Sequence, residues 1–126
     1  MNALNPAPGA EARGKVLAKA TMRAASLLGL NQADLAPMLG VSRATVSRIA
    51  GGTYALAPEQ KTWELAALFV RLFRSLDALV GSNETQARLW LNSENIALGA
   101  VPRSLLSTAE GLVRVVQYLD AARGEV

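Results

Sequence analysis

Two arginines in a short basic stretch are the residues of this sequence best suited to specific binding chemistry. Arg43 and Arg48 have no acidic residue between them. An arginine can donate two hydrogen bonds to the edge of a guanine, and Ala44 beside them can contact a thymine methyl group. We therefore predict that Arg43 and Arg48 contact DNA bases. A phosphate contact is the alternative, above all for Arg48.

Amide and hydroxyl side chains complete the candidate DNA-binding set. Gln32 and Ser42 each stand where a helix is predicted to begin, and helix N-termini bind phosphate groups readily. Thr45 and Ser47 are polar and are expected on the outer side of the second helix. The candidate DNA-binding residues are Gln32, Ser42, Arg43, Ala44, Thr45, Ser47 and Arg48.

The distribution of charge agrees with a nucleic-acid partner for the N-terminal half. Residues 1–57 carry six basic and two acidic side chains, for a net charge of +4. Residues 58–126 carry seven basic and eight acidic side chains, for a net charge of −1. A positive surface attracts the phosphate backbone. By itself this asymmetry would suit an ordinary solvated face, but beside the two arginines it favours DNA.

Histidine and cysteine are both absent from the chain. The usual zinc sites and the Ser–His and Cys–His nucleophile pairs therefore cannot form. A disulfide framework is excluded for the same reason. We expect a protein that is not an enzyme and that carries no metal and no cofactor. A small enzyme or ligand-sensing domain is the alternative class, which a screen for bound metabolites would test.

Two short helices, over residues 31–39 and 42–51, would position the candidate residues. Asn31 and Ser42 are suitable N-caps, and Gly40 between them can adopt the left-handed conformation of a tight turn. We interpret this pattern as a helix-turn-helix, whose second helix can enter a DNA major groove. The apolar residues expected between the two helices are Leu35, Ala36, Leu39, Val41, Val46 and Ile49.

The remainder of the chain is also predicted to be helical. Hydrophobic residues make up 51% and charged residues 18%, which indicates a globular protein. We predict a first helix over residues 10–28, whose inner stripe is Val16, Ala20, Ala24 and Leu27. We also predict a long helix over 58–80, with Pro58 in its first turn. It carries too many apolar residues for half of its surface to be exposed to solvent. It should be buried by both halves of the chain or by a second copy.

No apolar run approaches the ~18 residues that a membrane span needs. The first residues also lack the basic-then-apolar pattern of a signal peptide. We therefore expect a cytoplasmic protein with no membrane partner.

The predicted helix-turn-helix resembles the Xre-type family of phage-repressor-like DNA-binding motifs. The match is dense over about twenty residues. One departure is Pro37, which lies inside the first helix of the pair and should kink it or loosen its last turn. The matching residues are Gln32, Ala36, Gly40, Val41, Ser42, Val46, Ser47 and Gly52.

The C-terminal part resembles the toxin-binding domain of Xre/MbcA/ParS-type antitoxins over about residues 70–124. That family shows a helix ending in Trp-Leu, a loop with Asn and Leu-Gly, then Pro, a Leu pair and a last helix with Gly. Ala100 departs from it, because a second Gly or a polar residue is frequent there. The matching residues are Ala87, Trp90, Leu91, Asn95, Leu98, Gly99, Pro102, Leu105, Leu106, Gly111, Val115 or Val116, and Leu119.

Together the two resemblances imply an all-α antitoxin with an N-terminal Xre-type helix-turn-helix and a C-terminal helical toxin-binding domain. Such proteins pair with RES-domain toxins, which consume NAD or transfer ADP-ribose from it, and repress their own operon by binding operator DNA. Toxin contact is expected around the end of the last helix, at Tyr118, Asp120, Arg123 and Glu125. A stand-alone dimeric Xre-family repressor without a toxin partner is the alternative.

These inferences divide the chain into four predicted parts. We expect a homodimer, because one helix-turn-helix covers only half of an operator, and the long helix could supply the shared surface. The parts are a flexible arm over 1–9, a DNA-binding domain over 10–57, a connecting and dimerisation helix over 58–81, and a toxin-binding domain over 82–126.

Overall fold

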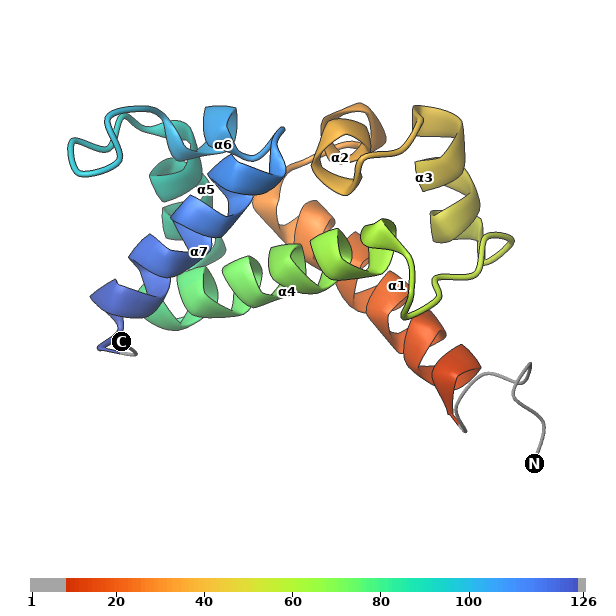
Figure 1. Ribbon diagram of the computed structural model, residues 1–126. Coiled ribbons are helices and arrows are strands. Elements are labelled where there is room, and N and C mark those ends of the chain that lie inside the picture. Colours follow the sequence, from red (N-terminus) through yellow and green to blue (C-terminus); the bar gives the residue numbers. More distant parts are fainter. Residues whose placement is uncertain (1–8, 125–126) are drawn as a thin grey trace.

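The computed structural model describes residues 9–124, which form a bundle of helices without a regular strand. The predicted arm therefore lies outside the described residues except for Gly9, as does Glu125. The all-α prediction is confirmed, and Figure 1 shows the arrangement of the helices. In order they are α1 (Ala10–Leu28), α2 (Gln32–Leu39), α3 (Arg43–Gly51), α4 (Lys61–Leu79), α5 (Glu84–Asn92), α6 (Pro102–Leu105) and α7 (Ala109–Ala122).

The long helix α4 is the centre of the fold. It packs against α1 and α2 on the side of the N-terminal half and against α7 and α5 on the other side. Phe69, Leu72 and Leu76 of α4 are all fully buried, and they belong to one core that includes residues of both halves. The expectation that both halves bury this helix is confirmed. Most of its apolar side chains are buried or half-buried within one chain, whereas Leu79 at its end is 41% exposed.

The start of α4 differs from the prediction. Pro58 precedes the helix, which begins at Lys61 after the N-cap Gln60. The backbone N–H of Gln60 donates to the Ala57 carbonyl at 3.0 Å, and the Gln60 Oε1 accepts from the Ala57 N–H at 3.3 Å. These two bonds close a turn over residues 57–60, and the helix follows this turn.

The inner face of α1 was predicted incorrectly at its N-terminal end. Val16, which was assigned to the inner stripe, is 66% exposed. The buried residue in this part of α1 is Gly14, on which a Cβ atom would lie only 2.4 Å from the Leu56 carbonyl oxygen. Residues two apart on a helix point in nearly opposite directions. Close approach of the chain at Gly14 therefore turns Val16 outward.

Pro37 lies inside α2 and does not end it, and the predicted kink or loosened last turn stays a prediction. The helix continues to Leu39 and ends at Gly40, which has the left-handed φ of 67°. Proline deprives the carbonyl four residues earlier of its helical hydrogen bond. That carbonyl belongs to Ala33, and both Ala33 and Pro37 are exposed. Water can therefore satisfy the group that the proline leaves unpaired.

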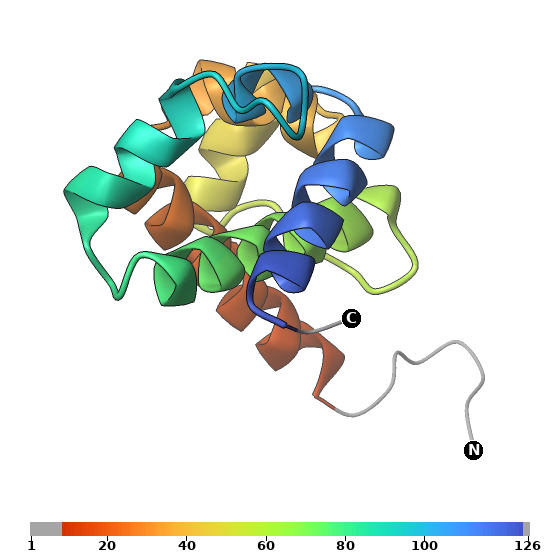
Figure 2. The ribbon, with the colours of Figure 1, turned by 90° about the vertical axis from the view of Figure 1, so that its left-hand side faces the viewer.

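Within residues 9–124, no helix is both long enough and apolar enough to cross a membrane. Figure 2 shows the end of the molecule formed by α5, α7 and the loop between α5 and α6. In Figure 1, this end lies opposite α3.

Candidate functional site

The helix-turn-helix is held in shape by local hydrogen bonds at both of its helix starts. The side chain of Asn31 accepts from the Asp34 N–H, and the Asp34 carboxylate accepts from the Asn31 N–H, both at 2.8 Å. The Oγ of Ser42 accepts from the Thr45 N–H at 3.1 Å. A capping box and an N-cap thus define where α2 and α3 begin. The N-cap predictions for Asn31 and Ser42 are confirmed.

Apolar contacts set α3 against the rest of the domain. Val46 and Ile49 of α3 are buried together with Leu35 and Leu39 of α2. Val46 and Ile49 lie on the same face of α3, and this face packs against α2. The opposite face is left to solvent, with Arg43, Ala44, Ser47 and Arg48 all exposed.

Thr45 and Arg48 are partly engaged with each other on this face. The Thr45 hydroxyl lies 3.0 Å from the Ser42 Oγ, and it accepts a hydrogen bond of 3.0 Å from Arg48 Nη2. Arg43 makes no side-chain hydrogen bond or ion pair to the residues that the structure describes. Arg43 in the first turn is therefore the more available guanidinium, and Arg48 is held beside the hydroxyl of Thr45.

The remaining candidates stand at the beginnings of the helices. Gln32 is the first residue of α2 and is half-buried, and Ser42 is the exposed N-cap of α3. Each is close to backbone N–H groups that the helix itself leaves unpaired. Those positions suit contacts to phosphate, which place a protein on a duplex without reading its sequence.

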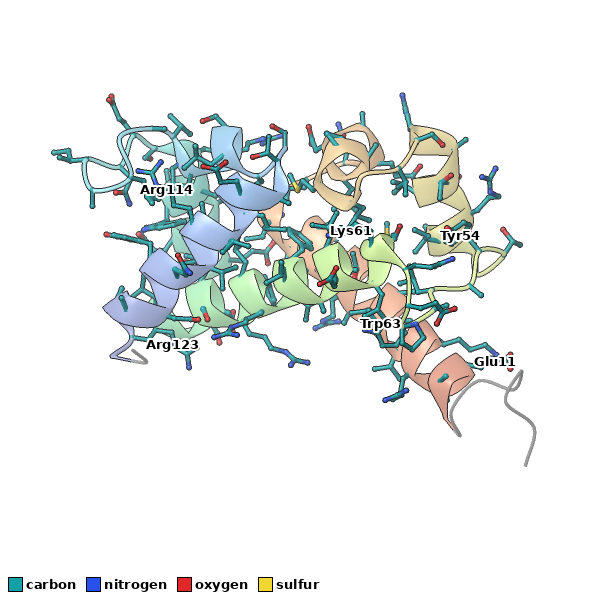
Figure 3. The ribbon with its side chains drawn as sticks, viewed as in Figure 1. Glu11, Tyr54, Lys61, Trp63, Arg114 and Arg123 are labelled. Carbon is teal, nitrogen blue, oxygen red and sulfur yellow. The ribbon has the colours of Figure 1, made fainter. Side chains whose placement is uncertain are left out.

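Part of the positive charge of α1 is used inside the chain. The Arg13 guanidinium lies over the ring of Trp63, 6.0 Å from its centroid. Lys15 is 3.7 Å from the Glu11 carboxylate. Figure 3 shows Trp63 beside α1 and Glu11 near the N-terminal end of that helix. Arg13 and Lys15 therefore each have a partner within the chain, and the net charge of the N-terminal half already includes the negative charge of Glu11.

Two arginines of the C-terminal half attach it to the N-terminal half. Arg88 of α5 donates to the carbonyls of Leu27 and Ser26 at 3.0 and 3.2 Å, where α1 ends. A cation is favourable at the C-terminus of a helix. Sequence reasoning missed this contact. The only signal in the sequence was the spacing of Arg88 four residues after Glu84, and the two form an ion pair of 2.8 Å.

Arg103 of α6 makes the second attachment. Its Nη2 lies 2.8 Å from the Asp34 carboxylate of α2, and its Nη1 donates to the Asn92 side chain at 3.2 Å. The same Asp34 completes the capping box of α2. One carboxylate therefore serves both the start of the helix-turn-helix and the contact to the C-terminal half.

Among the described residues predicted to contact a toxin, Tyr118 and Asp120 do not share one surface. Tyr118 faces α5, where its ring stacks on Trp90 with centroids 6.1 Å apart and planes at 27°. Asp120 faces α4 and is only 6% exposed. Side chains two residues apart on an α-helix differ in direction by about 200° around the helix axis. Tyr118 and Asp120 therefore point to different sides of α7.

Asp120 has a structural position in this fold. Its carboxylate accepts from the Arg71 guanidinium and, at 2.9 Å, from the Ser75 hydroxyl, both on α4. Arg123 also reaches α4, where Nη1 donates to the Ser75 Oγ at 3.0 Å. Figure 3 shows Arg123 where the end of α7 lies near α4. Asp120 and Arg123 are thus both hydrogen-bonded to α4, and their contact with a toxin stays a prediction.

Comparison with protein families identifies two domains. The antitoxin Xre-like helix-turn-helix domain matches residues 7–71, and the C-terminal toxin-binding domain of Xre/MbcA/ParS antitoxins matches residues 75–124. A search of curated protein sequences finds no match. The two domains point to a regulator that is not an enzyme. They occur in the predicted order and cover nearly all of the chain, which therefore belongs to the Xre/MbcA/ParS family of antitoxins.

Proposed function

We propose that this antitoxin neutralises a RES-domain toxin, an enzyme that consumes NAD or transfers ADP-ribose from it, and represses its own operon. The observation that carries the proposal is the placement of two surfaces on one molecule. Helix α3, whose residues Arg43, Ala44, Ser47 and Arg48 are exposed, and the end formed by α5–α7 lie on opposite sides of the molecule in Figure 1. DNA on the first surface would leave the second one open to a protein partner.

In this proposal α3 is the recognition helix. Arg43 and Ala44 in its first turn reach base edges in the major groove, and Arg48 reads a base or contacts phosphate. Gln32 and Ser42 position the protein through phosphate contacts. The support comes from the exposure of these side chains and from the caps that hold both helices.

The active DNA-binding form is proposed to be a homodimer. A single helix-turn-helix covers one half-site, and two half-sites in an operator lie ~34–36 Å apart. Measuring the molecular mass of the purified protein in solution tests this directly. A monomer at micromolar concentration, without toxin, would contradict it.

The DNA-binding part is tested by a gel-shift titration with a duplex from immediately upstream of the protein's own coding sequence. The variant is Arg43→Ala with Arg48→Ala. Each bidentate contact contributes ~1–3 kcal/mol, so the pair should weaken binding about 30-fold or more. Lys61→Ala with Arg74→Ala is the matched control, because it removes two exposed positive charges from α4. An unchanged shift for the α3 variant would refute the assignment.

The toxin-binding part is tested by purifying the antitoxin together with the protein encoded beside it in its operon. A complex with a RES-domain protein, and restored cellular NAD when both are expressed, are the expected results. A neighbouring protein of another fold that forms the complex would contradict the RES assignment.

A further inference from the structure

We propose that the toxin docks on an apolar surface at the α5–α7 end of the molecule, formed by Ile96, Leu89 and the stacked pair Trp90 and Tyr118. We call this the α5–loop surface. The inference rests on the proposed toxin-binding function and specifies where on residues 75–124 the toxin is held.

Exposure of large apolar side chains is concentrated in the toxin-binding domain. Among the described residues, the exposed large hydrophobic side chains are Val16, Leu79, Leu89 and Ile96. Three of these four lie within the matched residues 75–124. Ile96 is 96% exposed and Leu89 is 54% exposed. Exposed apolar side chains that gather in one region mark a site of protein interaction.

The loop that carries Ile96 is rigidly built. The Asn95 N–H donates to the Ala100 carbonyl at 3.0 Å, and the Asn95 side chain accepts from the Leu98 N–H at 3.0 Å. Gly99, at a left-handed φ of 70°, allows this tight return of the chain. Ile96 is therefore presented on a closed turn, and little conformational entropy is lost when it is buried by a partner.

Two further contacts tie this loop to the body. Leu98 is 3% exposed and fills the core, and Arg114 of α7 donates to the Leu98 carbonyl at 2.7 Å. Figure 3 shows Arg114 on α7 on the side of the loop. The loop is thus anchored at Leu98 while Ile96, two residues before it, points outward. Ile96 is therefore an exposed apolar side chain on a loop fixed to the core, which suits insertion into a pocket of a partner.

The aromatic pair gives the surface the chemistry of an interface core. Trp90 and Tyr118 are half-buried, and neither the indole N–H nor the phenol hydroxyl makes a hydrogen bond to another described residue. Tyrosine and tryptophan dominate the energetically important positions of interfaces. Figure 2 shows α5, the loop and α7 together on the side facing the viewer.

The charged end of α7 is less suited to be the main contact. Asp120 is buried against α4, and Arg123 donates to the Ser75 hydroxyl. Removing them from these bonds would break contacts that hold α7 in place. A partner that meets the α5–loop surface needs no such rearrangement.

The test measures binding of the full-length antitoxin to the toxin encoded beside it, in an inactive form, by calorimetry. Ile96→Asp places a charge at the proposed anchor and should weaken binding about 30-fold or more. Val16→Asp is the matched control, since Val16 is an exposed β-branched residue of α1 outside the toxin-binding domain, and it should bind within about threefold of the wild type. Both variants should keep the wild-type melting temperature and gel shift.

The outcomes separate the two proposals. If the wild-type antitoxin does not bind the RES-domain toxin, the proposed function fails. If the wild type binds and Ile96→Asp binds equally well, the proposed surface is wrong. Arg123→Ala losing 30-fold while Ile96→Asp is unaffected would also overturn the surface, in favour of the end of α7.

Discussion

Replacing Gly111 by alanine should destabilise the protein, although the same change normally favours a helix. Gly111 lies in the first turn of α7 and is buried. A Cβ atom there would stand 1.9 Å from the Leu105 carbonyl oxygen and 3.0 Å from the Thr108 Oγ1. The oxygen belongs to the backbone at the end of α6 and cannot rotate away. Real Cβ contacts almost never fall below 3.0 Å, so α6 and α7 must separate by about 1.1 Å.

The magnitude follows from three contributions. Alanine gains ~1 kcal/mol over glycine in helix propensity. Forcing an extra carbon into a filled space costs ~1–3 kcal/mol. The same shift strains the N-cap bond of 3.0 Å from the Gly111 N–H to the Thr108 hydroxyl, and loss of such a cap costs ~1 kcal/mol. We expect a net destabilisation of about 1–3 kcal/mol, with the melting temperature lower by about 5–10 °C.

The assay is thermal unfolding of the Gly111→Ala protein followed by circular dichroism, with Gly51→Ala as the matched control. Gly51 is helical, and a Cβ atom added there has nothing within 4 Å. Its replacement should leave the melting temperature unchanged or raise it by a few degrees. A Gly111→Ala protein as stable as the wild type would show that the α6–α7 approach is not constrained as described.

Three further substitutions test other contacts. Ser42→Ala should lower the free energy of unfolding in urea by ~1 kcal/mol because the α3 cap is lost, whereas Ser42→Gly should lower it by only a few tenths of a kcal/mol. Equal losses for the two variants would show that the Ser42 cap does not stabilise α3. Asp120→Asn should cost ~1–3 kcal/mol in the same assay, since a buried carboxylate with two donors is lost while Arg71 keeps access to water; wild-type stability would refute the structural role of Asp120. Arg103→Ala and Asp34→Asn should show a coupling of ~0.5–1 kcal/mol in a double-mutant cycle, as a partly exposed ion pair does; independent effects would mean that the two halves are not joined there.

The local features of the helix-turn-helix were predictable because short-range rules decide them. Asn31 and Ser42 cap helices through hydrogen bonds to residues three positions away, and Gly40 ends one by its own left-handed backbone. Neither feature needs any knowledge of the distant chain. The candidate DNA-binding residues were placed on one element by the same reasoning, and their exposure followed from the spacing of Val46 and Ile49.

By itself, the sequence thus determined that the chain is helical, where most of its helices begin and end, and that α4 had to be buried. The tertiary structure alone decided which side of each helix is used. Gly14 rather than Val16 meets the core, because a glycine carries no apolar signal yet allows the closest approach. Asp120 and Arg103 find their partners on helices 45 or more residues away in the sequence. Contacts over such distances depend on how helices cross, and the pattern of residues along one helix does not encode that crossing.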